Sequence, residues 1–66
     1  MDLGKVIKEL RQEKGVTRTQ FANDLNVHPG TVGNWEINKR QPEYEVLIRI
    51  ADYFGVTTDY LLGRQK

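Results

Sequence analysis

The chain has 66 residues, a net charge of +1 and no cysteine, which leaves room for one small domain and excludes disulfide bonds and thiolate metal sites. A domain near this length buries only about 60% of its unfolded surface, so a deep catalytic cleft is hard to accommodate and we do not expect an enzyme. No apolar run approaches the roughly 18 residues that a membrane-spanning helix needs, and the charged N-terminus does not resemble a signal peptide. The lack of cysteine is compatible with a reducing cytoplasm, where we expect the protein.

Charge is distributed unevenly along the chain. Residues 1–18 carry five bases and three acids, residues 19–42 carry two of each, and residues 43–66 carry three bases and four acids. Basic side chains therefore concentrate toward the N-terminus, a bias that ordinary surface scatter explains as well as a functional asymmetry does. The net charge itself is well below the strongly basic balance that is typical of nucleic-acid-binding domains.

Helical spacing of apolar residues predicts the first two helices. Before Gly15, apolar side chains recur at positions i, i+3, i+4 and i+7, which places them on one helix face, and Gly15 ends this helix. Thr17 then begins a second helix, and Gln20, three residues later, gives the pattern of a capping box. The expected buried face of the second helix is Phe21, Ala22 and Leu25.

A third helix is expected over residues 29–37. Pro29 suits the first helical position because its missing N–H would have no partner there, and His28 takes the capping position before it. Asn38 is a suitable stop because asparagine tolerates the left-handed conformation. The apolar pair of this helix, at i and i+3, is Val32 and Trp35.

Two further helices follow a polar loop that ends at Pro42. A broad apolar face predicts a fourth helix that ends at Gly55, and Thr57 caps a last short helix that ends at Gly63. Short helices at this density must pack around one core, so residues 1–66 are expected to form a single all-α, five-helix domain. The expected core residues are Leu3, Val6, Ile7, Leu10, Phe21, Ala22, Leu25, Val32, Trp35, Leu47, Ile50, Ala51, Phe54, Leu61 and Leu62.

Residues 17–37 combine a capped helix, a tight turn and a second helix, which is the helix-turn-helix arrangement. The second helix of this unit has the size to enter the major groove of B-DNA. The chain as a whole resembles the phage-repressor family of helix-turn-helix proteins, also described as Cro/repressor or xenobiotic-response-element-like. The matching segments, in the order and spacing of the family, are "LGKVIKELRQEKGVT", "TQFANDLNV", "VGNWEINKRQP", "LIRIADYFGV" and "TTDYLLG".

This resemblance implies a compact lambda-repressor-like domain that binds double-stranded DNA and regulates transcription, as a repressor in preference to an activator. We further expect a weak homodimer on a two-fold operator, in a prokaryotic or phage-type cytoplasm and associated with the nucleoid. No cofactor and no small-molecule site are expected. The alternative is a protein-interaction module of the same fold, with a toxin or an anti-repressor as partner, because the third helix is rich in glycine and the net charge is small.

The resemblance also assigns roles to individual positions of the chain. Arg11 and Glu36 match a pair that forms a partly buried salt bridge between the first and third helices in some family members. Base contacts would come from the exposed positions of the third helix, and phosphate contacts from the start of the second helix and from the loop after the third. The implied base-contact positions are Pro29, Gly30, Thr31 and Asn34, and the implied phosphate-contact positions are Arg18, Lys39 and Arg40.

The residue types of the third helix favour a thin reading surface. Asn34 is the main candidate base reader because its amide can form two hydrogen bonds with adenine, although a solvated residue or a local cap would look the same. Thr31 could touch a thymine methyl group or a phosphate, or could simply be an adequate first-turn residue. We add Gly33 to the base-contact candidates, because Gly30 and Gly33 would let the helix backbone approach the groove wall and leave DNA shape to supply further specificity.

The candidate phosphate contacts also have simpler explanations. Lys39 and Arg40 lie in an acid-free segment, residues 37–42, which suits phosphate binding but also describes an ordinary charged loop. Arg18 is at the start of a helix, where a positive charge is mildly unfavourable, and this small cost favours a functional explanation over a solvated one.

Four positions depart from the family pattern. Gly30 and Gly33 occupy positions that often hold polar base-reading residues, and the other two departures lie in the turn and in the cap before the third helix. Asn26 stands where the turn commonly has glycine, and His28 stands where serine or threonine usually caps.

His28 is the only histidine, so with no cysteine there is no metal-ligand cluster and no metal site is expected. The last segment offers an apolar surface for a dimer interface, although part of it must cover the core. Its candidate interface residues are Tyr60, Leu61 and Leu62.

Overall fold

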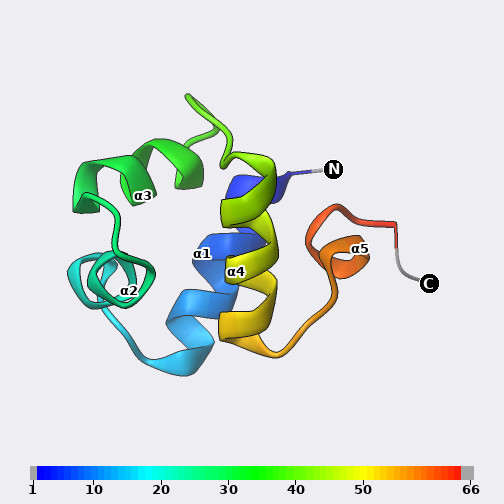
Figure 1. Ribbon diagram of the computed structural model, residues 1–66, viewed down its shortest axis with the longest axis horizontal. Helices are drawn as coiled ribbons and strands as arrows, with labels where there is room; N and C mark the ends of the chain where they lie inside the picture. Colours follow the sequence, from blue (N-terminus) through cyan, green and yellow to red (C-terminus); the bar gives the residue numbers. More distant parts are fainter. Residues whose placement is uncertain (1, 65–66) are drawn as a thin grey trace.

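The computed structural model describes residues 2–64, and this part of the chain is folded into α-helices without a strand (Figure 1). Two pairs of helices and one short helix surround a common core, which confirms the predicted all-α, five-helix architecture. Helices α2 and α3 lie on one side of α1 and α4, and α5 lies on the other side (Figure 1). The helices are α1 (Leu3–Lys14), α2 (Arg18–Leu25), α3 (Pro29–Glu36), α4 (Tyr44–Phe54) and α5 (Thr58–Leu61).

Short-range signals set most of the helix boundaries. The Thr17 side chain accepts a hydrogen bond from the Gln20 backbone N–H at 3.0 Å, so Thr17 caps α2 as predicted. A capping box would also need the Thr17 backbone N–H to donate to the Gln20 side-chain oxygen. Among the residues that the structure describes, this second hydrogen bond is not formed. Gly15 and Gly55 end α1 and α4 in the left-handed conformation, with φ of 77° and 68°, and Asn26 ends α2 with φ of 61°. Asparagine therefore supplies here the positive φ that the turn requires.

The core lies between α1, α2, α3 and α4, with Leu61 of α5 closing one side. Phe21 is at its centre. Its ring packs edge-on against Trp35 at a centroid distance of 6.5 Å and in a tilted arrangement against Phe54 at 5.1 Å. Leu62, expected in the core, is 39% exposed and lies after the end of α5, so that prediction was wrong. The fully or nearly fully buried apolar residues are Ile7, Phe21, Ala22, Leu25, Val32, Trp35, Ile50, Ala51 and Leu61.

Several residues that the sequence did not single out also pack against this core. Most are valines in the connections between helices, whose spacing carries no helical period and which were therefore not assigned to an apolar face. Tyr53 joins them because its ring packs against Phe21 at 5.2 Å, while its hydroxyl donates to Asp24 at 2.7 Å. The added core residues are Val16, Val27, Val46, Tyr53 and Val56.

A glycine in the first turn of α1 allows the start of α1 to approach the end of α3. A Cβ atom on Gly4 would lie 2.3 Å from the Trp35 carbonyl oxygen and 2.7 Å from that of Glu36, distances that real Cβ atoms do not adopt. The Gly4 backbone N–H instead donates to Asn38 Oδ1 at 3.0 Å, and Asn38 Nδ2 donates to Asp2 Oδ1 at 2.7 Å. This Asn38 clamp, formed by Asp2, Gly4 and Asn38, holds the two helix ends together.

Asn38 adopts the left-handed conformation that the sequence predicted for it, with φ of 61°. The last helical residue of α3 is Glu36, one residue before the expected end at Ile37. In the part of the chain that the structure describes, no helix has the length and apolar character needed to cross a membrane.

Candidate nucleic-acid interface

The start of α3 is held by an unusual cap. His28 Nδ1 accepts a hydrogen bond from the Gly30 backbone N–H at 3.0 Å, so the imidazole replaces the hydroxyl that a serine or threonine would offer. A Cβ atom on Gly30 would lie 3.1 Å from that same Nδ1 atom and 3.4 Å from Cε1. Glycine at position 30 therefore leaves room for the imidazole cap, which is a structural reason for this residue that the sequence pattern did not reveal.

Val32, Trp35 and Glu36 are the buried residues of α3, and the candidate base-contact residues occupy the rest of its surface. Gly30 is exposed, and the other candidates, Pro29, Thr31, Gly33 and Asn34, are partly exposed. Gly33 differs from Gly4 and Gly30, because a Cβ atom there would meet nothing within 4 Å. Neither packing nor backbone conformation within the domain requires glycine at position 33.

The loop after α3 is fastened to the helix by its backbone. The Asn34 carbonyl oxygen accepts from the Lys39 N–H at 2.9 Å and from the Arg40 N–H at 3.3 Å. The side chains of Lys39 and Arg40 are exposed, and neither forms an ion pair with the residues that the structure describes. Two cationic side chains are thus held directly beyond the end of α3, next to the candidate base readers.

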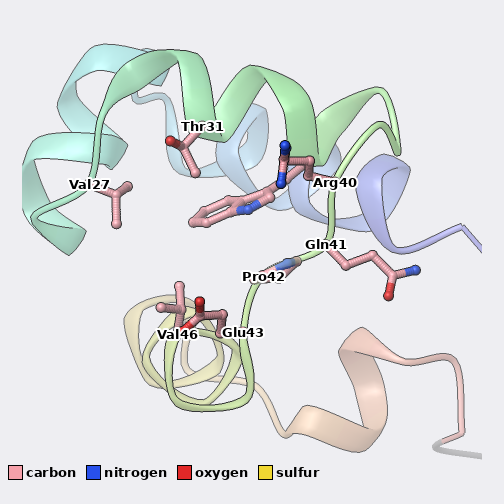
Figure 2. Close-up of a pocket in the computed structure, with 8 residues that line it drawn as sticks. Val27, Thr31, Arg40, Gln41, Pro42, Glu43 and Val46 are labelled. Atoms are coloured by element: carbon pink, nitrogen blue, oxygen red, sulfur yellow. The ribbon is translucent and has the colours of Figure 1, made fainter.

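A cleft of about 340 Å³ separates α3 from this loop and from the start of α4. Figure 2 shows Val27 and Thr31 on one side of it and Glu43 and Val46 on the other, with Arg40 in the loop after α3. Thr31 and Arg40 therefore border the same cleft, so a candidate base-contact residue and a candidate phosphate-contact residue belong to one surface. The lining residues are Val27, Thr31, Trp35, Arg40, Gln41, Pro42, Glu43 and Val46.

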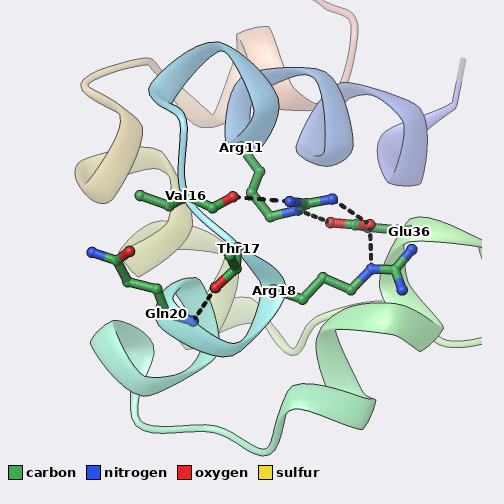
Figure 3. Close-up of polar contacts among 6 residues, drawn as sticks. All are labelled: Arg11, Val16, Thr17, Arg18, Gln20 and Glu36. Atoms are coloured by element: carbon green, nitrogen blue, oxygen red, sulfur yellow. Dashed lines mark hydrogen bonds and ion pairs between the residues drawn. The ribbon is translucent and has the colours of Figure 1, made fainter.

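The end of α3 carries a buried carboxylate that two arginines bind (Figure 3). Only 1% of the Glu36 side chain is exposed. Arg11 of α1 donates from Nε to Glu36 Oε2 at 2.7 Å and from Nη2 to Oε1 at 3.4 Å, and its Nη1 donates to the Val16 carbonyl at 2.9 Å. Arg18, the first residue of α2, donates from Nε to Glu36 Oε1 at 3.0 Å. This Glu36 cluster, formed by Arg11, Arg18 and Glu36, joins α1, α2 and α3.

The cluster keeps its carboxylate ionised. Burial on its own raises the pKa of Glu36, but the hydrogen bonds and charges of Arg11 and Arg18 outweigh burial, and the net pKa lies below the ordinary value. A buried carboxylate with hydrogen bonds from two guanidinium groups satisfies the condition under which a buried ion pair is tolerated.

The sequence model of the helix-turn-helix family matches residues 7–61, which is most of the chain. The chain belongs to the helix-turn-helix family. Among curated proteins, it is 38% identical over all of its residues to the HTH-type transcriptional regulator ImmR of Bacillus subtilis (strain 168), of which it covers 52%. It is 33% identical over all of its residues to the HTH-type transcriptional activator BcrR of Enterococcus faecalis, of which it covers 32%.

Among solved structures, the fold is similar to that of the P22 c2 repressor protein, crystallised in complex with synthetic operator 9T. The TM-score is 0.91, the sequence identity is 20%, and the match covers 98% of each chain. This likeness confirms the lambda-repressor-like fold of the helix-turn-helix domain. The chain spans about half or less of the length of the two curated relatives.

The predicted DNA-contact and ion-pair residues lie in two parts of the domain: α3 with the loop after it, and the Glu36 cluster. The structure brings Arg11 and Glu36 together as an ion pair and adds Arg18, which the sequence placed only in a phosphate-contact role. Leu61 is fully buried in the core, which corrects its assignment as a dimer-interface candidate, whereas Tyr60 and Leu62 are exposed. Within residues 2–64, no group of three or more histidine, cysteine, aspartate or glutamate side chains could hold a metal ion.

Proposed function

We propose that this helix-turn-helix domain is the sequence-specific, double-stranded DNA-binding part of a transcriptional regulator, a repressor in preference to an activator. Family membership supports the proposal of a DNA-binding regulator, as does the similarity to the transcriptional regulator ImmR and the transcriptional activator BcrR. The shared fold with the P22 c2 repressor, crystallised with an operator, supports a repressor. The observation that carries it is the arrangement at α3. The loop after this helix presents the exposed side chains of Lys39 and Arg40, and its backbone is hydrogen-bonded to the Asn34 carbonyl oxygen of the helix.

In this proposal α3 enters the major groove with Asn34 as the main base reader. Its side chain is partly exposed and has no hydrogen-bond partner among residues 2–64, so its amide is free to bond adenine. Thr31 would contact a thymine methyl group or a phosphate from the same surface. Pro29, Gly30 and Gly33 would let the backbone lie close to the bases.

Lys39 and Arg40 would bind phosphate groups beside the groove, joined by Arg18 at the start of α2. Such contacts supply most of the affinity and fix the register of the reading helix without carrying sequence information. The proposal therefore separates affinity, which Lys39 and Arg40 provide, from sequence preference, which Asn34 provides.

A weak homodimer would match a two-fold operator, with half-sites about one helical turn, roughly 34 Å, apart. Tyr60 and Leu62 are exposed by 45% and 39%, and the neighbouring helix α4 adds exposed Tyr44 and Ile48. We expect sedimentation to detect a dimer more readily when a duplex with paired half-sites is present. A monomer both in isolation and on paired sites would contradict the dimer.

The function is tested by binding to random duplexes over a series of salt concentrations, followed by selection of a preferred duplex. We expect binding that weakens with salt, and Lys39→Ala or Arg40→Ala should weaken it on every sequence and reduce the logarithmic salt slope by about 0.9. Asn34→Ala should weaken binding to the selected duplex more than to random DNA. If the wild-type domain binds no duplex even at low salt, the alternative of a protein-interaction module is favoured instead.

A further inference from the structure

The Glu36 cluster carries more positive than negative charge. One carboxylate faces two guanidinium groups, and its lowered pKa means that it is ionised at neutral pH. The cluster of Arg11, Arg18 and Glu36 therefore has a net charge of +1. A partly buried cation without a full counter-charge is unfavourable, because the free-energy cost of removing it from water is only partly offset by attraction to an anion.

The two arginines of the cluster differ in what they leave unbonded. Arg11 uses all three guanidinium nitrogens within the domain, and only 12% of its side chain is exposed. Arg18 uses only Nε, and its Nη1 and Nη2 atoms have no partner among residues 2–64. Half of the Arg18 side chain is exposed, and in Figure 3 no dashed line reaches either of its two terminal nitrogens. The surplus charge is thus accessible at Arg18.

We propose that Glu36 is a positioning residue for DNA binding, which holds Arg18 through Nε so that Nη1 and Nη2 together bind one phosphate group of the duplex. This inference rests on the proposed function, since it assumes that the bound anion is a DNA phosphodiester. The planar guanidinium has separate donor edges, so one edge can bond a carboxylate while another forms a bidentate contact with phosphate. Because Arg18 is the first residue of α2, the helix dipole also favours an anion there.

The connection through Glu36 gives this contact a second consequence. Glu36 is the last residue of α3, so Arg18 is tied directly to the helix that carries the candidate base readers. A phosphate bound by Arg18 would therefore fix the register of α3 in the groove. An arginine already held in its bonded conformation also loses less side-chain freedom on binding.

A double-mutant cycle on duplex binding tests the inference, with Arg18→Ala, Glu36→Gln and the double variant compared by fluorescence anisotropy over a range of salt concentrations. Arg18→Ala should weaken binding to all duplexes by about tenfold and reduce the logarithmic salt slope by about 0.9. Glu36→Gln removes a negative charge near the DNA, which by simple electrostatics would strengthen binding. We expect it to weaken binding instead, and we expect this weakening to disappear in the Arg18→Ala background.

The matched control for charge is Glu13→Gln, because Glu13 is exposed on α1 and forms no ion pair with residues 2–64. It should leave affinity unchanged or raise it slightly. Stronger binding of Glu36→Gln, or the same effect of Glu36→Gln with and without Arg18, would overturn the inference. Far-UV circular dichroism must first show that the Glu36 variants are folded at the temperature of measurement.

A second variant keeps the inference testable if the Glu36 variants unfold. Arg18→Lys preserves the charge on a half-exposed side chain but cannot bond Glu36 and hold a phosphate through two further nitrogens at once. We expect it to recover only part of the affinity lost in Arg18→Ala. Binding equal to wild type would refute the positioning role of Glu36 and leave the proposed function intact, whereas a wild-type domain that binds no duplex would refute the proposed function itself.

Discussion

The C-terminal end of α3 is joined to α1 and α2 by side-chain hydrogen bonds. Its N-terminal half is held by the buried Val32 and, within residues 2–64, by one side-chain hydrogen bond, from the Gly30 N–H to His28. At the C-terminal end, Glu36 binds two arginines and Asn38 binds both Gly4 and Asp2. Near the middle of the helix, ahead of this bonded end, the space beside Gly33 is open.

This difference assigns two tasks to two parts of α3: one part positions the helix in the domain, and the other is available to contact DNA bases. The bonded end sets the position of α3 relative to α1 and α2, because each of its contacts joins residues that lie far apart in the chain. The lightly held half is left with a bare backbone and few side chains, which suits close approach to a groove. Substitutions at the two ends should therefore have opposite effects on stability and on DNA binding.

The largest effect is expected for Gly4→Ala at the bonded end. Its methyl group would clash with the carbonyl oxygens of Trp35 and Glu36, which are backbone atoms that cannot rotate away. We expect a loss of about 3 kcal/mol in the free energy of unfolding, measured by urea denaturation, because overpacking forces α1 and α3 apart. A loss below about 1 kcal/mol would mean that the Asn38 clamp tolerates a shift of α1.

Low pH should weaken the hydrogen bonds and ion pairs that hold this C-terminal end of α3. In the folded protein, hydrogen bonds from Asn38 and from the Lys5 backbone N–H lower the pKa of Asp2 below its ordinary value of 3.8, and the pKa of Glu36 lies below 4.5. A carboxyl with a lowered pKa stabilises the fold above its unfolded-state pKa, and this stability is lost as the pH falls through the folded-state value. We therefore expect the thermal midpoint to fall as the pH drops below about 4.5.

The matched variant for the acid prediction is Asp2→Asn. An asparagine keeps an oxygen that can accept from Asn38 and from the Lys5 N–H, but it does not titrate. Its midpoint should respond less to acid than that of the wild type. Identical acid profiles for the two proteins would show that Asp2 contributes nothing to the pH dependence.

The smallest effect on stability, with the opposite sign, is expected for Gly33→Ala, near the middle of α3 and outside the bonded end. A methyl group there meets no atom within 4 Å, so alanine should raise the free energy of unfolding by up to about 1 kcal/mol through its higher helix propensity. If close approach to DNA is the reason for the glycine, the same change should reduce affinity for the selected duplex. Unchanged affinity would mean that Gly33 is merely tolerated.

Much of the fold could be predicted from the sequence because its signals are local. Thr17 caps α2 by bonding an N–H three residues away, and Gly15 and Gly55 end their helices through their own backbone conformation. Asn38 was predicted to stop α3 for the same kind of reason. Leu62 was misassigned because helical spacing continued past the point where α5 ends, and spacing alone does not show where an apolar face meets solvent.

The sequence by itself determined the five helices, most of the core and the helix-turn-helix unit, since capping, periodicity and turn chemistry act over a few residues. Only the tertiary structure decided that Gly4 must be glycine, that Asn38 clamps the start of α1, and that Arg18 shares Glu36 with Arg11. These contacts join positions 34, 18 and 25 residues apart, so no local pattern encodes them. They form only when packing of the core brings the ends of α1, α2 and α3 to one place, where burial makes each unpaired polar group costly and each complementary pair specific.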